Sequence, residues 1–403
     1  MKKFLTRNIL LLSFVSFFTD IASEIIYPVL PLYFTSIGLS YAAIGAIEGV
    51  AELVAGLSKV FFGLFSDKLG KKVIFINLGY GISAFAKPLL GLSQSLPFIL
   101  FVRITDRFSK GIRTAPRDAI LIAESKEENR GKVFSYHRSM DTLGAALGPV
   151  VALIVLIASN NNYSQLFLLT LIPGVIALIL TFLIKVKEQN SDAPVQSKGK
   201  QISFANFLKL APTNYKKLLL GLVLIAFLNS TDFFFLLRAR EILNLNNAFG
   251  FTFPIEFIVV ILYIIYNLSF VLVANPIGVL SDKLGHKKSM VAGMIVFGLV
   301  YGLFAYNVTL PLLVLTFVLC GIFGTIYDSI GKAWLSLYIP KEYKATGIGL
   351  LVTLMAVATF AGNLFMGILI DRFNTGIAFS IISVLSIGLI GYFSFIKLTD
   401  SKD

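Results

Sequence analysis

Long apolar stretches alternate with short polar or turn-rich breaks along almost the whole chain. Most stretches reach the roughly 20 residues that an α-helix needs to cross the hydrocarbon core of a bilayer, and their boundaries can be placed to within about four residues. The pattern predicts twelve membrane-spanning helices, at approximately 8–35, 41–66, 72–93, 96–123, 131–158, 164–186, 217–243, 254–281, 288–306, 309–338, 346–371 and 375–397. We therefore expect an all-α membrane protein.

One long polar segment interrupts this series. Residues 187–216 contain several charged residues together with Pro194 and Gly199, which is typical of a linker, and hold one short amphipathic piece at 202–210. The segment divides the chain into an N-terminal six-helix bundle, residues 1–186, and a C-terminal six-helix bundle, residues 217–403.

Lysine and arginine are unevenly shared between the two sets of connecting loops. The connections at 36–41, 92–97, 158–165, 244–253 and 306–310 hold neither residue, whereas the N-terminus, the linker and the alternate loops hold many. Cytoplasmic loops carry the excess of positive charge in membrane proteins. We therefore predict that both termini and the linker are cytoplasmic, which requires an even number of spans.

The composition agrees with membrane insertion. Hydrophobic residues make up 56% of the 403 residues and charged residues only 14%, against about 25% charged in soluble proteins. The net charge of +13 would suggest nucleic acid in a soluble protein, but most of the surplus lies in the loops that set the orientation. With one cysteine and two histidines in the chain, we expect no disulfide, no metal site and no nucleic-acid partner.

A charged loop motif occurs twice, at half-chain spacing. Gly63-Leu-Phe-Ser-Asp67-Lys-Leu-Gly70-Lys-Lys follows the second span, and Gly278-Val-Leu-Ser-Asp282-Lys-Leu-Gly285-His-Lys-Lys follows the eighth, so the aspartates are 282 − 67 = 215 residues apart. Glycine permits tight turns and close helix approach, and the basic pair can bind lipid headgroups. Two related six-helix halves are typical of transporters with a central binding site.

On these motifs the sequence resembles the major facilitator superfamily over essentially its whole length. The loop from Gly63 to Lys72 is similar to the family's signature between helices two and three, and Arg107-Phe-Ser-Lys110-Gly111 is similar to its Arg-x-x-x-Gly motif. Gly148-Pro149 in the fifth span resembles a motif of the drug:proton antiporter branch, although Lys110 stands where those antiporters usually carry Gln. The resemblance implies alternating access between two pseudo-symmetric bundles.

Many ionisable residues fall inside the predicted spans, where each costs several kcal/mol unless it faces the bundle interior, so each is a functional candidate. They are Asp20 and Glu24 in the first span, Glu48, Glu52 and Lys59 in the second, Lys87 in the third, Arg103, Asp106, Arg107, Lys110, Arg113 and Arg117 in the fourth, Asp232 in the seventh, and Asp328 and Lys332 in the tenth. The concentration in the N-terminal half indicates that coupling occurs there.

Two interpretations remain open for the acidic residues. A carboxylate in a partly dry cavity can load a proton and release it when a cation approaches, which would make Asp20, Glu24, Glu52 and Asp232 proton-coupling groups. Alternatively, the acids of the first two spans neutralise the basic stripe of the fourth.

Arg107 is our first candidate for substrate binding and coupling, since its motif resembles the family arginine with that role. A guanidinium also binds carboxylate or phosphate bidentately. We add Arg103, Lys110, Tyr27 and Lys87 to this set, and Lys87 could equally be a snorkelling structural lysine. For conformational gating we name Gly63, Asp67, Gly70, Asp282, Arg113, Arg117, Gly148 and Pro149.

The sequence therefore predicts a proton-coupled secondary transporter of a small organic solute, with no cofactor beyond the proton gradient and no enzymatic activity. Export is favoured by Gly148-Pro149. A proton symporter that imports an organic anion or metal chelate is the alternative, favoured by the bases of the fourth span, and a non-transporting receptor is a third. We expect a monomer in the cell membrane, of the bacterial cytoplasmic type, with the lipid bilayer and one small molecule as its partners.

Overall fold

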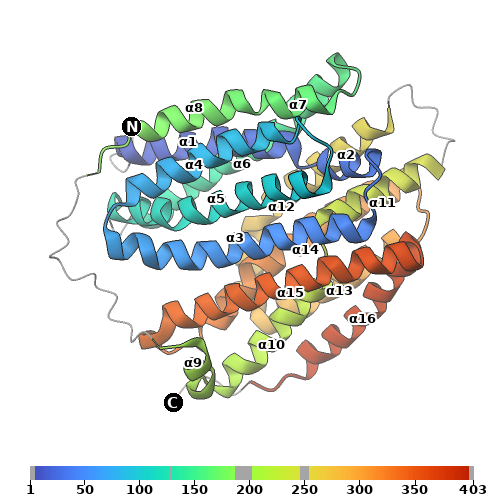
Figure 1. Ribbon diagram of the computed structural model, residues 1–403. Helices are drawn as coiled ribbons and strands as arrows, with labels where there is room; N and C mark the ends of the chain where they lie inside the picture. The colour runs from blue at the N-terminus through green and yellow to red at the C-terminus, as the bar shows by residue number, and fades with distance from the viewer. Residues whose placement is uncertain (1–4, 127–128, 187–201, 246–253, 399–403) are drawn as a thin grey trace. The chain divides into compact units, whose positions relative to one another are not determined.

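The computed structural model describes residues 5–126, 129–186, 202–245 and 254–398, and none of these residues forms a β-strand. The helices are α1 (Arg7–Ile26), α2 (Leu30–Ser36), α3 (Tyr41–Leu69), α4 (Lys72–Leu89), α5 (Leu96–Ala123), α6 (Arg130–Ala158), α7 (Tyr163–Leu169), α8 (Leu171–Phe182), α9 (Phe204–Leu210), α10 (Thr213–Leu228), α11 (Asp232–Leu245), α12 (Ile255–Leu284), α13 (His286–Ala305), α14 (Leu310–Ser336), α15 (Lys344–Arg372) and α16 (Thr375–Phe395). Figure 1 shows them in the colours of the chain order.

Each predicted span coincides with one helix or with two consecutive helices. Among the described residues, nine of these stretches are long and apolar enough to cross a membrane by length and composition. The predicted spans at 41–66, 72–93 and 96–123 correspond to α3, α4 and α5, which are not among the nine. Two of these three, α3 and α5, carry most of the buried charge of the first half, and α4 carries Lys87.

Three of the predicted spans are interrupted helices. Pro28 follows the end of α1, where a proline removes a backbone donor. Between α10 and α11, the backbone N–H of Ser230 donates to the Tyr301 hydroxyl at 3.0 Å and that of Thr231 to Asn363 Oδ1 at 2.8 Å. Side chains of neighbouring helices thus satisfy the backbone at this break, as a non-helical segment at membrane depth requires.

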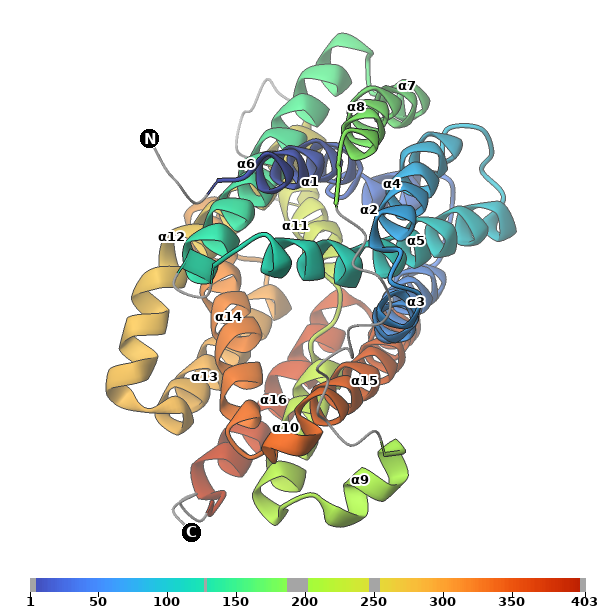
Figure 2. The ribbon, with the colours of Figure 1, turned by 90° about the vertical axis from the view of Figure 1, so that its left-hand side faces the viewer.

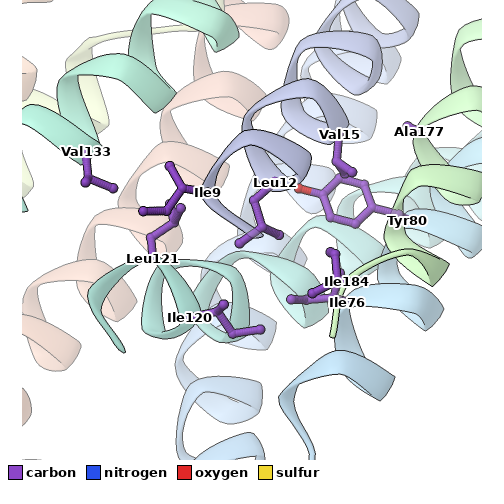
Figure 3. Close-up of a cluster of buried hydrophobic side chains, with 10 residues drawn as sticks. All are labelled: Ile9, Leu12, Val15, Ile76, Tyr80, Ile120, Leu121, Val133, Ala177 and Ile184. Carbon is purple, nitrogen blue, oxygen red and sulfur yellow. The ribbon is translucent and has the colours of Figure 1, made fainter. Parts of the chain in front are cut away.

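The chain forms two compact units, residues 1–39 with 50–196, and residues 40–49 with 197–403. In the first unit α1 packs against α6 and α8, and α4 against α5 and α8. Figure 3 shows the apolar side chains that fill the space between these helices. They are Ile9, Leu12, Val15, Ile76, Tyr80, Ile120, Leu121, Val133, Ala177 and Ile184.

In the second unit α13 packs against α14 and α16, α12 against α14, and α10 against α15. The three helices α13, α14 and α16 are visible side by side in Figure 2. The short helix α9 lies beside the start of α10, where the rings of Phe207 and Tyr215 are 5.2 Å apart in an edge-to-face contact.

Residues 40–49, the start of α3, group with the second unit because they lie against α15. The backbone N–H groups of Tyr41 and Ala42 donate to the Asp371 carboxylate at 3.0 and 2.8 Å, which caps the first turn of α3. A Cβ added at Gly45 would lie 2.2 Å from the carbonyl oxygen of Asn363. The two helix backbones therefore touch, and only glycine fits at this position.

The duplicated loop motif has one shared backbone feature. Gly70 after α3 and Gly285 after α12 both adopt positive φ, at +67° and +84°. A side chain at either position would be strained, so the glycines of the motif provide the turn that ends each helix.

Candidate functional site

Helix α5 carries the densest run of charge in the first unit, and its neighbours α1, α3, α4 and α6 supply charges of the opposite sign. Arg103, Asp106 and Arg113 are buried on α5. Charges cannot be left unpaired inside a bundle, so the partners of these residues define the candidate site.

Lys87 on α4 forms a buried ion pair with Asp106. The ammonium Nζ lies 2.9 Å from Asp106 Oδ1, with the lysine side chain only 4% exposed. The Ser83 hydroxyl donates to the same carboxylate oxygen at 2.8 Å and also contacts the Lys87 ammonium. The predicted binding residue Lys87 is thus held against α5 inside the bundle.

Arg107 forms the second ion pair of α5. Its Nη1 lies 3.5 Å from Oε1 of Glu52 on α3, so the structure brings together the predicted coupling arginine and a predicted proton-coupling acid. Lys110, one turn further along, interacts electrostatically with Glu52 and with Asp20. Arg103 also interacts electrostatically with Glu52.

Asp20 on α1 faces the basic residues of α5 and α6. The charges that act on its carboxylate are those of Lys110, Arg117, Arg113 and Arg138. A Cβ added at Gly144 would lie 2.4 Å from the carbonyl oxygen of Phe17 and 3.1 Å from Cβ of Asp20. The absence of a side chain at Gly144 therefore allows α6 to touch α1 beside Asp20.

Gly148 makes the same kind of contact one turn further along α6. A Cβ there would lie 2.5 Å from Cβ of Glu24. The spacing of Gly144 and Gly148 is the small-residue pattern of close membrane-helix packing. Pro149 follows inside α6, and Tyr27 lies directly after the last residue of α1.

Arg113 and Arg117 lie towards the C-terminal end of α5. The Arg113 guanidinium lies 4.6 Å from the centre of the Tyr80 ring, a cation–π distance, and Nη1 is 3.5 Å from the Gly79 carbonyl. Arg117 pairs with Asp118, with Nη2 at 2.8 Å from Oδ1, and donates from Nη1 to the Ser16 hydroxyl at 3.2 Å.

The Ser16 hydroxyl is the meeting point of four helices. Besides Arg117 of α5, it contacts Nε2 of His137 on α6 at 3.0 Å and the hydroxyl of Tyr80 on α4 at 3.5 Å. The other ring nitrogen of His137, Nδ1, lies 3.5 Å from Oδ2 of Asp141. Ser16, Tyr80, His137 and Asp141 were not among the sequence candidates, although a histidine followed by an aspartate four residues later inside a span is a signal that could have found two of them.

The remaining predicted residues are distributed as follows. Asp232 is the first residue of α11 in the second unit, directly after the helix break. Gly63 lies in the last turns of α3, where an added Cβ would meet Ala115 at 3.3 Å. The side chains of Asp67, Asp282 and Asp328 lie outside the described part of the structure.

A buried arginine in the second unit was also missed, because it stands near the end of a predicted span. Arg238 on α11 donates to the Phe304 carbonyl at 2.8 Å, to Thr375 at 3.0 Å and to Asn307 at 3.1 Å, and it pairs with Glu241 at 3.1 Å. These contacts join α11 to the end of α13 and the start of α16. Within the described residues, no group of three or more His, Cys, Asp or Glu side chains could hold a metal ion.

Comparison with protein-family models matches this chain to the Major Facilitator Superfamily at residues 12–265 and 222–403. The uncharacterized MFS-type transporter MJ1317 of Methanocaldococcus jannaschii is 35% identical over 366 residues, which cover 91% of this chain and 89% of the relative. The quinolone resistance protein NorA of Staphylococcus aureus is 24% identical over 145 residues, 36% of this chain and 37% of NorA.

Solved structures give the same fold at low sequence identity. The nucleoside transporter NupG matches with a TM-score of 0.79 and 16% identity, over 96% of this chain and 98% of NupG. A bacterial homolog of the human lysosomal transporter Spinster, in an inward-facing and occupied conformation, matches with a TM-score of 0.74 and 13% identity, over 98% of this chain and 97% of that one.

Proposed function

The chain belongs to the major facilitator superfamily, a family of multi-pass membrane transporters, and on this premise we propose that it is a proton-coupled secondary transporter that exports a small organic solute by alternating access. The proton gradient is its energy source, and no cofactor takes part. Asp20, with Glu24, Glu52 and Asp232, provides proton-binding carboxylates, and Arg107 couples them to the substrate.

The observation that carries this proposal is the position of Asp20. Its side chain is partly buried beside the contact of α1 with Gly144 of α6, and the charges of Lys110, Arg113, Arg117 and Arg138 act on its carboxylate. Movement of one of these bases would change the charge balance around Asp20 and hence its proton affinity. Proton binding to Asp20 and the rearrangement of the surrounding helices would then depend on each other, which is what coupling requires.

The direction of transport is proposed from sequence similarity. Gly148-Pro149 resembles the antiporter motif, and NorA, which shares a partial match with this chain, is a quinolone resistance protein. Two basic residues of α5 form ion pairs with acids, Arg107 with Glu52 and Arg117 with Asp118, and the buried Lys87 of α4 pairs with Asp106. This balance favours a neutral or cationic solute over an anion.

We propose the following membrane arrangement. The chain has twelve spans, with both termini and the linker in the cytoplasm, and functions as a monomer in the cytoplasmic membrane of a prokaryotic cell. The archaeal origin of MJ1317 means that this membrane need not be bacterial.

The test is proton-driven flux in liposomes. Purified protein is first screened by thermal shift against anionic, zwitterionic and lipophilic cationic compounds, and the compound that stabilises it most is then added to liposomes that contain a pH indicator. We expect an imposed pH gradient to drive accumulation, and Asp20→Asn to reduce it at least tenfold while substrate exchange without a gradient persists.

Glu124→Gln is the matched control, because Glu124 accepts a hydrogen bond from Asn8 at the end of α5 and lies outside the site. Full proton-driven accumulation by Asp20→Asn would contradict the proposed role of that carboxylate. If anionic compounds alone stabilise the protein and drive proton uptake in the same direction, the alternative of anion import, which the excess of bases on α5 favours, replaces export.

A further inference from the structure

His137, which is buried, and Asp141, which is partly buried, form a pair that the proposed coupling scheme does not use. They stand four residues apart on α6, with the His137 side chain 4% and the Asp141 side chain 14% exposed. His137 Nε2 contacts the Ser16 hydroxyl at 3.0 Å and Nδ1 lies 3.5 Å from Asp141 Oδ2, so both ring nitrogens have a defined neighbour.

Asp141 lies next to a second carboxylate. Asp20 on α1 and Asp141 on α6 repel each other electrostatically, and Gly144, one turn after Asp141, brings the two backbones into contact there. The Oδ1 atom of Asp141 is buried and has no hydrogen-bond partner among the described residues. Two neighbouring, partly buried carboxylates of this kind can share one proton.

The other charged and titratable groups around the pair are few. Arg117 faces it from α5 and Arg138 from α6, while Lys110 and Arg113 of α5 act on its Asp20 side. Tyr80 of α4 contacts Ser16. The bases offset the repulsion between the two carboxylates, and gain or loss of one proton by a carboxylate changes the local charge by one unit.

We propose that Asp141 carries a proton during the transport cycle and that His137 is a positioning residue that links this proton to Arg117 through the Ser16 hydroxyl. The inference rests on the proposed function, because it adds a second carboxylate to the same coupling site. Arg117 also pairs with Asp118, so the link reaches an ion pair at the C-terminal end of α5.

The link works through the two forms of a neutral imidazole, in which one nitrogen donates and the other accepts. When Asp141 is ionised, Nδ1–H of His137 faces the carboxylate and Nε2 accepts from the Ser16 hydroxyl. When Asp141 takes up a proton, its O–H faces Nδ1 of His137. The imidazole ring then carries its hydrogen on Nε2 and donates it to the Ser16 hydroxyl. Ser16 in turn points its own hydrogen towards Tyr80.

The proton balance of this change is one proton gained by Asp141. A proton that arrives from the Ser16 side binds Nε2, the hydrogen on Nδ1 passes to Asp141 Oδ2, and the ring remains neutral. Arg117 donates to Ser16 Oγ in both states. When Asp141 is protonated, Nε2–H of His137 donates to the same oxygen, so only then must Ser16 accept from these two donors together.

The first experiment follows the ring by nitrogen NMR. The chain contains two histidines, and His286→Gln therefore leaves His137 as the single ¹⁵N-histidine signal in the full-length protein. We expect the Nδ1–H form at high pH and the Nε2–H form at low pH, with no such change in Asp141→Asn. A ring whose form does not depend on pH, or one that changes equally in Asp141→Asn, overturns the link.

The second experiment measures transport. We expect Asp141→Asn to lose proton-driven accumulation at least tenfold, Asp141→Glu to recover part of it, and both to keep substrate exchange without a gradient. His137→Asn, which keeps an amide near the Nδ1 position, should move the pH of half-maximal transport less than His137→Ala does. His286→Gln is the control and should behave as the unchanged protein.

The two readouts separate this inference from the proposed function. A His137 variant that lowers the rate equally at every pH has only a structural role, and normal proton-driven transport by Asp141→Asn excludes Asp141 as a carrier. If the unchanged protein transports without proton coupling, the proposed function fails together with the transport role of Asp141, while the NMR experiment still decides the His137–Asp141 link.

Discussion

At the scale of single residues, charged side chains inside the first unit lie against specific partners of opposite charge. Sequence spacing places Arg103, Arg107 and Lys110 on one face of a helix, but it does not tell which acid each one meets. The structure pairs Arg107 with Glu52 at 3.5 Å and Lys87 with Asp106 at 2.9 Å. The Lys87–Asp106 pair is the buried one of the two and is costly to break, because removal of one partner leaves a buried charge without compensation.

Lys87→Met tests this cost directly. The substitution removes the ammonium and leaves the Asp106 carboxylate buried with the Ser83 hydroxyl. We expect a loss of about 3–5 kcal/mol in the free energy of unfolding, measured by thermal or denaturant unfolding in detergent. The double substitution Lys87→Met with Asp106→Asn should recover most of the loss, since it removes both charges and keeps an acceptor for Ser83.

An unchanged unfolding temperature in Lys87→Met would mean that the pair adds no stability. Normal stability together with lost substrate binding would instead support the binding role that the sequence left open for Lys87.

The candidate site could be predicted in part, because burial of charge in an apolar span is visible in the sequence. This signal indicates Asp20, Glu52 and Arg107, and the structure places Glu52 against Arg107. Ser16 and Tyr80 could not be found in this way, because a hydroxyl in an apolar stretch carries no charge signal. Their role depends on four helices that meet at the Ser16 hydroxyl, which is a property of the tertiary structure.

At the scale of helices, the close approach of α1 and α6 follows from Gly144 and Gly148 on α6. Their four-residue spacing is visible in the sequence, and the structure shows that both glycines contact α1. The order of the helices and most of their boundaries were also predictable from hydropathy, because spans must satisfy their backbones internally. The break between α10 and α11 was not, since it depends on Tyr301 and Asn363 of other helices.

Gly148→Ala should separate α1 from α6. The added Cβ would lie 2.5 Å from Cβ of Glu24 and 2.9 Å from its backbone carbonyl carbon, which is overpacking that costs about 1–3 kcal/mol. The matched control is Gly131→Ala in the same helix, where an added Cβ has no atom within 4 Å. Unfolding in detergent should distinguish the two variants, with the control within about 0.5 kcal/mol of the unchanged protein. Equal stability of both would argue against a tight contact at Gly148.

At the scale of the whole molecule, the membrane topology depends on whether α3, α4 and α5 cross the bilayer. Nine stretches among the described residues qualify by hydropathy, and α3, α4 and α5 do not. Nine is odd and would put the two ends of the chain on opposite sides. The positive charge of the N-terminal segment and of the linker predicts that both are cytoplasmic, which requires an odd number of the remaining three helices to span; all three give the predicted twelve.

Helix α5 is the sharpest test of this count, because its buried charges lower its hydropathy most. Cys320 is the sole cysteine and is buried, so Cys320→Ser gives a background for single cysteines at the exposed residues Gln94 and Lys126 on either side of α5. In intact cells we expect a membrane-impermeant maleimide to label Gln94→Cys, and Lys126→Cys only after permeabilisation. Labelling of both from outside would show that α5 does not span, and the reverse pattern would invert the orientation that the loop charges predict.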